Sequence, residues 1–106
     1  GARTVEVPVC LDGRRVGTLY VEPAGTDTSF RAACTAMGGL PLQAGDAGFE
    51  FTLLGNYRLR MLLWAGDDEF PPSAQLLYSA NFVDGFAAED RVVAGDLLCN
   101  EIKANL

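Results

Sequence analysis

The sequence predicts an α+β fold, a small mostly antiparallel sheet built from two hairpins plus one short strand, with two helices packed on one face. In two regions, apolar residues alternate with polar ones on both sides of a turn signal, which indicates hairpins. In two other regions, apolar residues recur at helical spacing, which indicates helices. The implied order is strand, strand, helix, three strands, helix, which lacks the regular β-α-β alternation of parallel sheets. With 106 residues, 49% of them hydrophobic, the chain fits one domain over residues 1–106 with one core.

Residues 3–22 are predicted to form the first hairpin. Apolar residues alternate with polar or small ones up to Asp12-Gly13, a strong signal for a two-residue turn. Continued without a break, that register pairs Val9 with Val16. Because Pro8 has no N–H to donate to a second neighbour, we expect its strand at the edge of the sheet.

A short helix follows, capped by Thr26 or Asp27. It ends at Gly38-Gly39, which tolerates positive φ angles. Residues 40–48 are rich in glycine and alanine, and we expect them to form a loop. The buried stripe of the helix has i, i+3, i+4, i+7 spacing and consists of Phe30, Ala33, Cys34 and Met37.

Residues 49–64 are predicted to form a second hairpin. Its register follows from the burial of apolar side chains and the pairing of opposite charges across the strands. A three-residue loop pairs Phe51 with Leu59 and sets Glu50 across from Arg60 on the other face. A two-residue turn would place arginines among the phenylalanines, because a slip of one residue turns every side chain over. The longer loop is therefore favoured.

The alternation fails after Met61, where Leu62, Leu63 and Trp64 are all apolar. A strand with apolar residues on both sides is covered on both faces. We expect the cover to come from within the domain or from a partner, which makes these three residues the candidates for a partner interface.

The C-terminal part of the chain is predicted to contain a rigid acidic loop and a final helix. The loop covers residues 66–72, a short strand covers residues 74–78, and a turn covers residues 81–85. The helix runs from about residue 88 to about residue 104.

Charge and residue types exclude several classes of function. Eight Lys and Arg against fourteen Asp and Glu give a net charge of −6, which argues against nucleic acid and anionic membranes as partners. The absence of histidine excludes histidine metal sites and catalysis by Ser-His or Cys-His pairs. The cysteines form no C-x-x-C pair and suit buried positions in a reducing, cytoplasmic compartment: Cys10, Cys34 and Cys99.

The tract from Trp64 to Ala74, with its G-D-x-E-F-P core, resembles domain-of-unknown-function family 3786, an uncharacterised family of anaerobic bacteria and archaea. The likeness covers about the last two thirds of the chain. It implies an anaerobic, cytoplasmic setting near iron–sulfur and corrinoid proteins of one-carbon metabolism, and no reaction. Relatives have an acidic residue near Ser79, a Thr near Ala88 and a longer N-terminal side. We therefore expect a shortened member or the C-terminal portion of a longer domain, with Gly1 left from cloning.

The acidic loop concentrates ionisable groups at Asp67, Asp68 and Glu69. Glu89 or Asp90 would approach them if the final helix starts beneath the loop, where their charges suit the helix dipole. Crowded carboxylates gain a proton, bind a cation or accept backbone N–H groups. Mg²⁺ or Ca²⁺ would accept such oxygens, although the D-x-D-x-D-G spacing of a calcium loop is absent.

We expect the acidic loop to be structural, with Phe70 in the core, and the chain to be a small non-catalytic module that binds another protein or itself. No cofactor is predicted, because three scattered cysteines cannot make a four-thiolate iron–sulfur site. The alternative is a metal-dependent enzyme or ligand-binding protein that uses the carboxylates of Asp67–Glu69.

Overall fold

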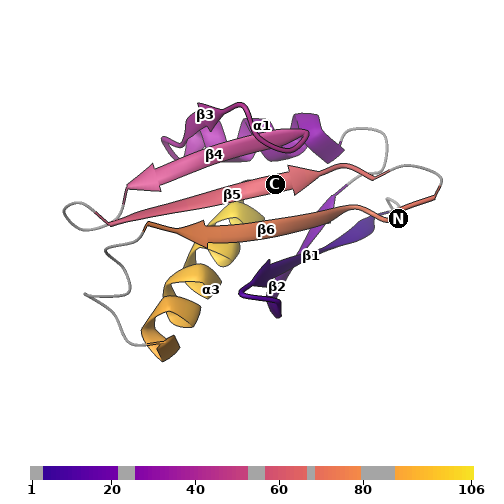
Figure 1. Ribbon diagram of the computed structural model, residues 1–106. Helices are drawn as coiled ribbons and strands as arrows, with labels where there is room; N and C mark the ends of the chain where they lie inside the picture. Colours follow the sequence, from indigo (N-terminus) through magenta and orange to yellow (C-terminus); the bar gives the residue numbers. More distant parts are fainter. Residues whose placement is uncertain (1–3, 22–25, 53–56, 67–68, 80–87) are drawn as a thin grey trace.

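The described residues form six strands in one sheet and two helices that cover one of its faces (Figure 1). The computed structural model describes residues 4–21, 26–52, 57–66, 69–79 and 88–106, with the backbone alone for residues 88–92. The elements are β1 (Val5–Leu11), β2 (Arg14–Val21), α1 (Thr26–Ala36), β3 (Leu40–Leu42), β4 (Ala47–Thr52), β5 (Arg58–Trp64), β6 (Ser73–Tyr78) and α3 (Ala88–Asn105).

The strands lie in the order β2-β1-β6-β5-β4-β3, and each neighbouring pair is antiparallel except β1 and β6. The predicted α+β class is confirmed, in a sheet larger than predicted. The added strand is β3, which lies where we expected a loop. Its middle residue, Pro41, pairs with Phe49 at the edge of the sheet, where a missing N–H leaves no second neighbour unsatisfied.

One face of the sheet packs against both helices and forms the core. α1 contacts β4 and β5, α3 contacts β1 and β2, and the two helices contact each other (Figure 1). The ring of Phe30 on α1 packs edge-on against Phe49 on β4, with centroids 5.9 Å apart. Fully buried side chains from the two helices and from β1, β2, β5 and β6 include Val7, Leu19, Phe30, Cys34, Met61, Leu76, Cys99 and Ile102.

The register of the first hairpin differs from the prediction beyond its turn. Asp12 and Gly13 have φ angles of 51° and 77°, so the two-residue turn is present. A bulge then shifts the pairing, and Val9 lies opposite Gly17 instead of Val16. The shift turns Leu19 and its inward neighbours on β2 toward the helices, so burial of β2 is the physical reason for the correction.

The prediction that β1 is an edge strand is wrong, because β1 lies between β2 and β6. The parallel ladder to β6 covers Val9 to Leu11 and begins one residue after Pro8. The missing N–H of the proline therefore does not interrupt the ladder. The hydroxyl of Tyr78 on β6 also donates a 2.8 Å hydrogen bond to the carboxylate of Asp12 in the hairpin turn.

The predicted register of the second hairpin is confirmed. Phe51 pairs with Leu59 and Glu50 pairs with Arg60. The predicted loop at 54–56 and the predicted turn at 81–85 lie outside the described residues. The helices and β6 lie within one or two residues of their predicted bounds.

α3 approaches the sheet closely because glycines lie at two contact points. A Cβ on Gly17 of β2 would lie 3.2 Å from the sulfur of Cys99, and one on Gly95 of α3 would lie 2.9 Å from Leu76 of β6. Neither described helix is long and apolar enough to cross a membrane.

Candidate functional site

The face of the sheet that points away from the helices is the candidate site, and we call it the outer face. Side chains at paired positions share a face, so the register places Leu40, Glu50, Arg60 and Leu77 in one row across four strands. Arg58 and Trp64 follow on the same side of β5. The outer face consists of Leu40, Glu50, Arg58, Arg60, Trp64 and Leu77, and three of these are exposed large hydrophobic residues.

Leu62 also points to the outer face, but it is covered within the domain. Its side chain is 8% exposed and it does not belong to the core cluster beneath the helices. The missing Cβ of Gly48, its partner on β4, leaves space that Leu62 and Leu42 enter from the two neighbouring strands. The carbonyl oxygen of Ala44 closes over the same position.

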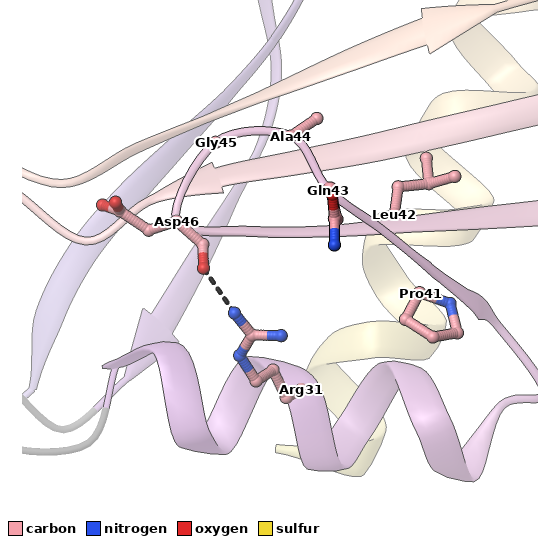
Figure 2. Close-up of a pocket in the computed structure, with 7 residues that line it drawn as sticks. All are labelled: Arg31, Pro41, Leu42, Gln43, Ala44, Gly45 and Asp46. Atoms are coloured by element: carbon pink, nitrogen blue, oxygen red, sulfur yellow. Dashed lines mark hydrogen bonds between the residues drawn. The ribbon is translucent and has the colours of Figure 1, made fainter.

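The turn between β3 and β4 provides this cover and is held at Asp46, its last residue before β4 (Figure 2). The N–H of Asp46 donates to the carbonyl oxygen of Leu63 at 2.8 Å, and the Asp46 carboxylate accepts the N–H of Ala65 at 2.8 Å. The guanidinium of Arg31 on α1 donates to the Asp46 carbonyl oxygen. Arg31 and Asp46 border a shallow depression of about 680 Å³ along the turn.

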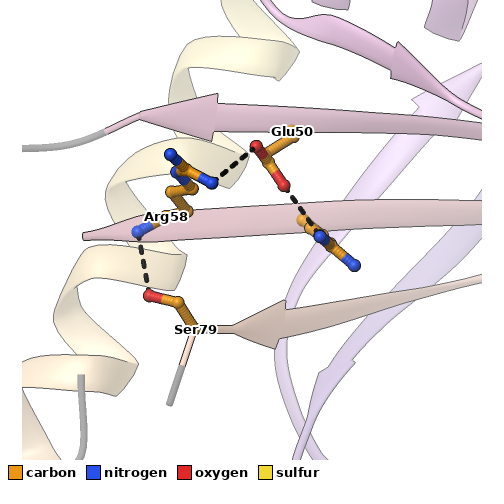
Figure 3. A network of polar contacts seen from close by, with 4 residues as sticks. Glu50, Arg58 and Ser79 are labelled. Atoms are coloured by element: carbon orange, nitrogen blue, oxygen red, sulfur yellow. Dashed lines mark hydrogen bonds and ion pairs between the residues drawn. The ribbon is translucent and has the colours of Figure 1, made fainter. Parts of the chain in front are cut away.

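An ionic cluster of Glu50, Arg58 and Arg60 lies on the outer face, and Figure 3 shows its polar contacts. The Nε of Arg60 donates to the Glu50 carboxylate at 2.8 Å, and Nη1 of Arg58 lies 3.8 Å from the other carboxylate oxygen. The backbone of Arg58 exchanges two hydrogen bonds with Ser79, which extends the β5–β6 ladder. A pocket of about 390 Å³ opens among these residues, next to Leu77 and Tyr78.

A second pocket, of about 340 Å³, lies beside Trp64. Its walls include Asp46, Phe70, Pro71 and Ser73. The expectation that Phe70 fills the core is wrong, because its side chain is 67% exposed. The core beneath Trp64 is occupied instead by inward residues of β4, β5 and β6, so the ring of Phe70 is left at the surface.

The structure describes few of the acidic candidates. Asp67 and Asp68 and the side chains of Glu89 and Asp90 lie outside the described residues, and Glu69 is exposed. Among the described residues, no three Cys, Asp or Glu side chains are grouped to hold a metal ion.

The three candidates for a partner interface, Leu62, Leu63 and Trp64, differ in how deeply they are buried. Leu62 and Leu63 are buried, Leu63 within the core, and Trp64 is exposed. Trp64 is therefore the member of this group whose side chain is accessible to solvent.

Two buried thiols lie at the other side of the sheet, in the core beneath the helices. Burial raises the pKa of Cys34 to about 12. Burial, with a smaller effect of the Asp96 charge, raises the pKa of Cys99 to about 11, against an opposing effect of Lys103. Because a thiolate is the reactive form, both groups are poor nucleophiles at neutral pH.

The chain matches the sequence model of a known protein family. The sequence model of the family described as Domain of unknown function (DUF3786) matches residues 23–101, well over half of the chain. The chain belongs to this family. The DUF3786 match runs from just before α1 into α3 and includes every residue of the outer face. No curated protein and no solved structure matches the chain.

Sequence reasoning missed two of the six residues of the outer face in this DUF3786 domain. It paired Glu50 with Arg60 and singled out Trp64. It did not find Leu40, because β3 was expected to be a loop, or Leu77, because the face of β6 depends on its partner strand. The pairing of β6 with β5 supplies the missing information: Leu77 lies opposite Arg60.

Proposed function

We propose that this DUF3786 domain is a non-catalytic module that binds another protein through the outer face. The observation that carries the proposal is the exposure of Leu40, Trp64 and Leu77 on a face that the described helices leave uncovered. Exposed apolar side chains interspersed with polar and charged groups are typical of protein interfaces. Arginine and tryptophan are also among the residue types that most often contribute a large share of the binding free energy in such interfaces.

A different protein is favoured over a second copy of this chain. Two copies each carry a net charge of −6 and repel one another at low ionic strength. A partner with a neutral or basic surface meets no such barrier. The family resemblance names candidates, the iron–sulfur and corrinoid proteins of one-carbon metabolism in a cytoplasmic, anaerobic setting.

The proposal is tested by affinity capture with a matched pair of variants. In the first variant, Leu40→Ser and Leu77→Ser remove apolar area from the outer face. In the control, Val93→Ser and Leu97→Ser remove exposed apolar area from α3. We expect wild type and control to retain the same proteins from a native extract, and the outer-face variant to lose them, because about 1–3 kcal/mol of binding free energy disappears with each buried leucine.

Three outcomes contradict the proposal. Unchanged capture by the outer-face variant would remove the outer face from the interaction. Loss of capture in the control would move the interaction to α3. A dimer of the isolated 11.3 kDa chain in light scattering, abolished by the outer-face changes, would show that the occupant is a second copy.

A further inference from the structure

The two arginines of the outer face keep most of their hydrogen-bonding capacity. Arg60 uses only its Nε on Glu50, and the Arg58 guanidinium lies 3.8 Å from the carboxylate, beyond hydrogen-bond distance. Within the described part of the chain, neither guanidinium has a further partner. Each side chain is also about half exposed, at 55% and 54%. The free N–H groups therefore reach solvent at the surface of the sheet.

The local charge is unbalanced. Two guanidinium groups surround one carboxylate, and Glu50 is only 11% exposed because the arginines and neighbouring strands cover it. The cluster therefore carries one positive charge on a chain whose net charge is −6. Guanidinium groups bind carboxylates and phosphates with two parallel N–H donors. An oxyanion is therefore the class of ligand that matches the charge and the donors of this cluster.

The surroundings favour a carboxylate. One carboxylate neutralises the single excess charge, whereas a phosphate group carries about −1.5 to −2 and would leave the cluster negative. Leu77 borders the pocket of about 390 Å³ that holds both arginines, and Leu40 lies in the same row beyond Glu50. An acidic side chain flanked by apolar residues meets both kinds of group at once.

We infer that Arg58 and Arg60 bind an aspartate or glutamate side chain of the partner protein, with apolar residues of the partner on Leu40 and Leu77. This inference rests on the proposed function for its occupant. The carboxylate takes the free Nη groups of the two arginines, and Glu50 competes with it for the same donors.

The competition makes the inference testable with acetate as the probe and inorganic phosphate as the alternative. The arginine Nε–Hε resonances are followed by NMR at constant ionic strength, with chloride as the reference anion. We expect saturable shifts at Arg58 and Arg60 with acetate. Arg58→Gln should weaken acetate binding about threefold, and Glu50→Gln should strengthen it about threefold, because an exposed charge pair contributes roughly this factor.

Arg15 and Glu6 supply the matched controls. They form an exposed pair 3.7 Å apart on β2 and β1, away from Leu40 and Leu77. Arg15→Gln and Glu6→Gln should leave the acetate affinity at Arg58 unchanged. Equal effects of these controls, shifts identical to those with chloride, weaker binding in Glu50→Gln or tighter binding of phosphate than of acetate would each overturn the inference.

The failures of the two proposals are distinguishable. If capture of the partner depends on Leu40 and Leu77 but is unchanged by Arg58→Gln, the carboxylate inference is wrong and the protein-binding function stands. If acetate binds as expected but no captured protein depends on the outer face, the anion site stands and the proposed occupant is wrong.

Discussion

Burial determines the chemistry of Cys34 and Cys99. Both side chains are almost fully inaccessible, and each has a pKa raised mainly by desolvation of its thiolate. The third cysteine, Cys10, was also expected to be buried but is only partly buried, at the outer side of the sheet. Scattered cysteines thus act here as small apolar groups where the helices meet the sheet.

The raised pKa values predict a loss of stability at alkaline pH. In the unfolded chain the thiols lose their protons above a pH of about 9, whereas in the folded chain they keep them up to about 11 or 12. The stabilisation is therefore complete below about pH 9 and is lost as the pH rises toward the folded values. We expect the free energy of unfolding to fall by about 1 kcal/mol per pH unit for each thiol in that window.

Denaturant unfolding measured across this range tests the expectation. In Cys34→Ala, the free energy of unfolding should fall less steeply with rising pH than in the wild type. Val7→Ala, which also shortens a fully buried side chain but removes no thiol, should lower stability without changing the dependence. Identical dependence on pH in Cys34→Ala and wild type would show that burial does not control this thiol.

At the scale of elements, the turn between β3 and β4 decides which side chains the outer face exposes. Gly45 has a φ of 63°, and a Cβ on it would lie 2.8 Å from the carbonyl oxygen of Leu63. The same Cβ would lie 3.5 Å from the ring of Trp64. The turn therefore needs glycine at this position for two reasons, positive φ and close approach to β5.

Gly45→Ala is expected to lower the free energy of unfolding by about 3 kcal/mol, because backbone strain and a clash act together. Gly13→Ala is the matched control, with a φ of 77° and open space around its Cβ, and it should cost only about 1 kcal/mol. Emission from Trp64, the one tryptophan of the chain, should change in the first variant and not in the second. Equal costs in the two variants would contradict the close approach.

The elements show where sequence reasoning succeeds and where it stops. Hydrophobic period and turn residues predicted the second hairpin with its register, because cross-strand burial and charge agree there. The bulge opposite Val9 and the strand at Leu40–Leu42 were missed. The bulge accompanies packing of β2 against α3, which is distant in the sequence. Among the described strands, β3 pairs only with its neighbour β4, and its three residues, one of them a proline, carry no alternation long enough to indicate a strand.

At the scale of the whole molecule, the structural role of the acidic loop, residues 66–72, remains a prediction. We expect millimolar Mg²⁺ or Ca²⁺ to leave the thermal midpoint unchanged, since a metal that binds the folded state would raise it. A rise with either ion that Asp67→Asn abolishes would instead support the alternative of a metal-dependent enzyme or ligand-binding protein. Asp27→Asn, an exposed carboxylate in the first turn of α1, serves as the control.

The amino-acid sequence by itself determined the fold class, the second hairpin, both helices and the net charge, because each follows from local period, turn chemistry or composition. Tertiary structure decided which apolar residues remain at the surface. Leu62 and Trp64 are neighbours on one face of β5, yet the turn after β3 buries the first and leaves the second exposed. Exposure depends on what packs above a residue, and that is set by strand order, which no local pattern in this chain encodes.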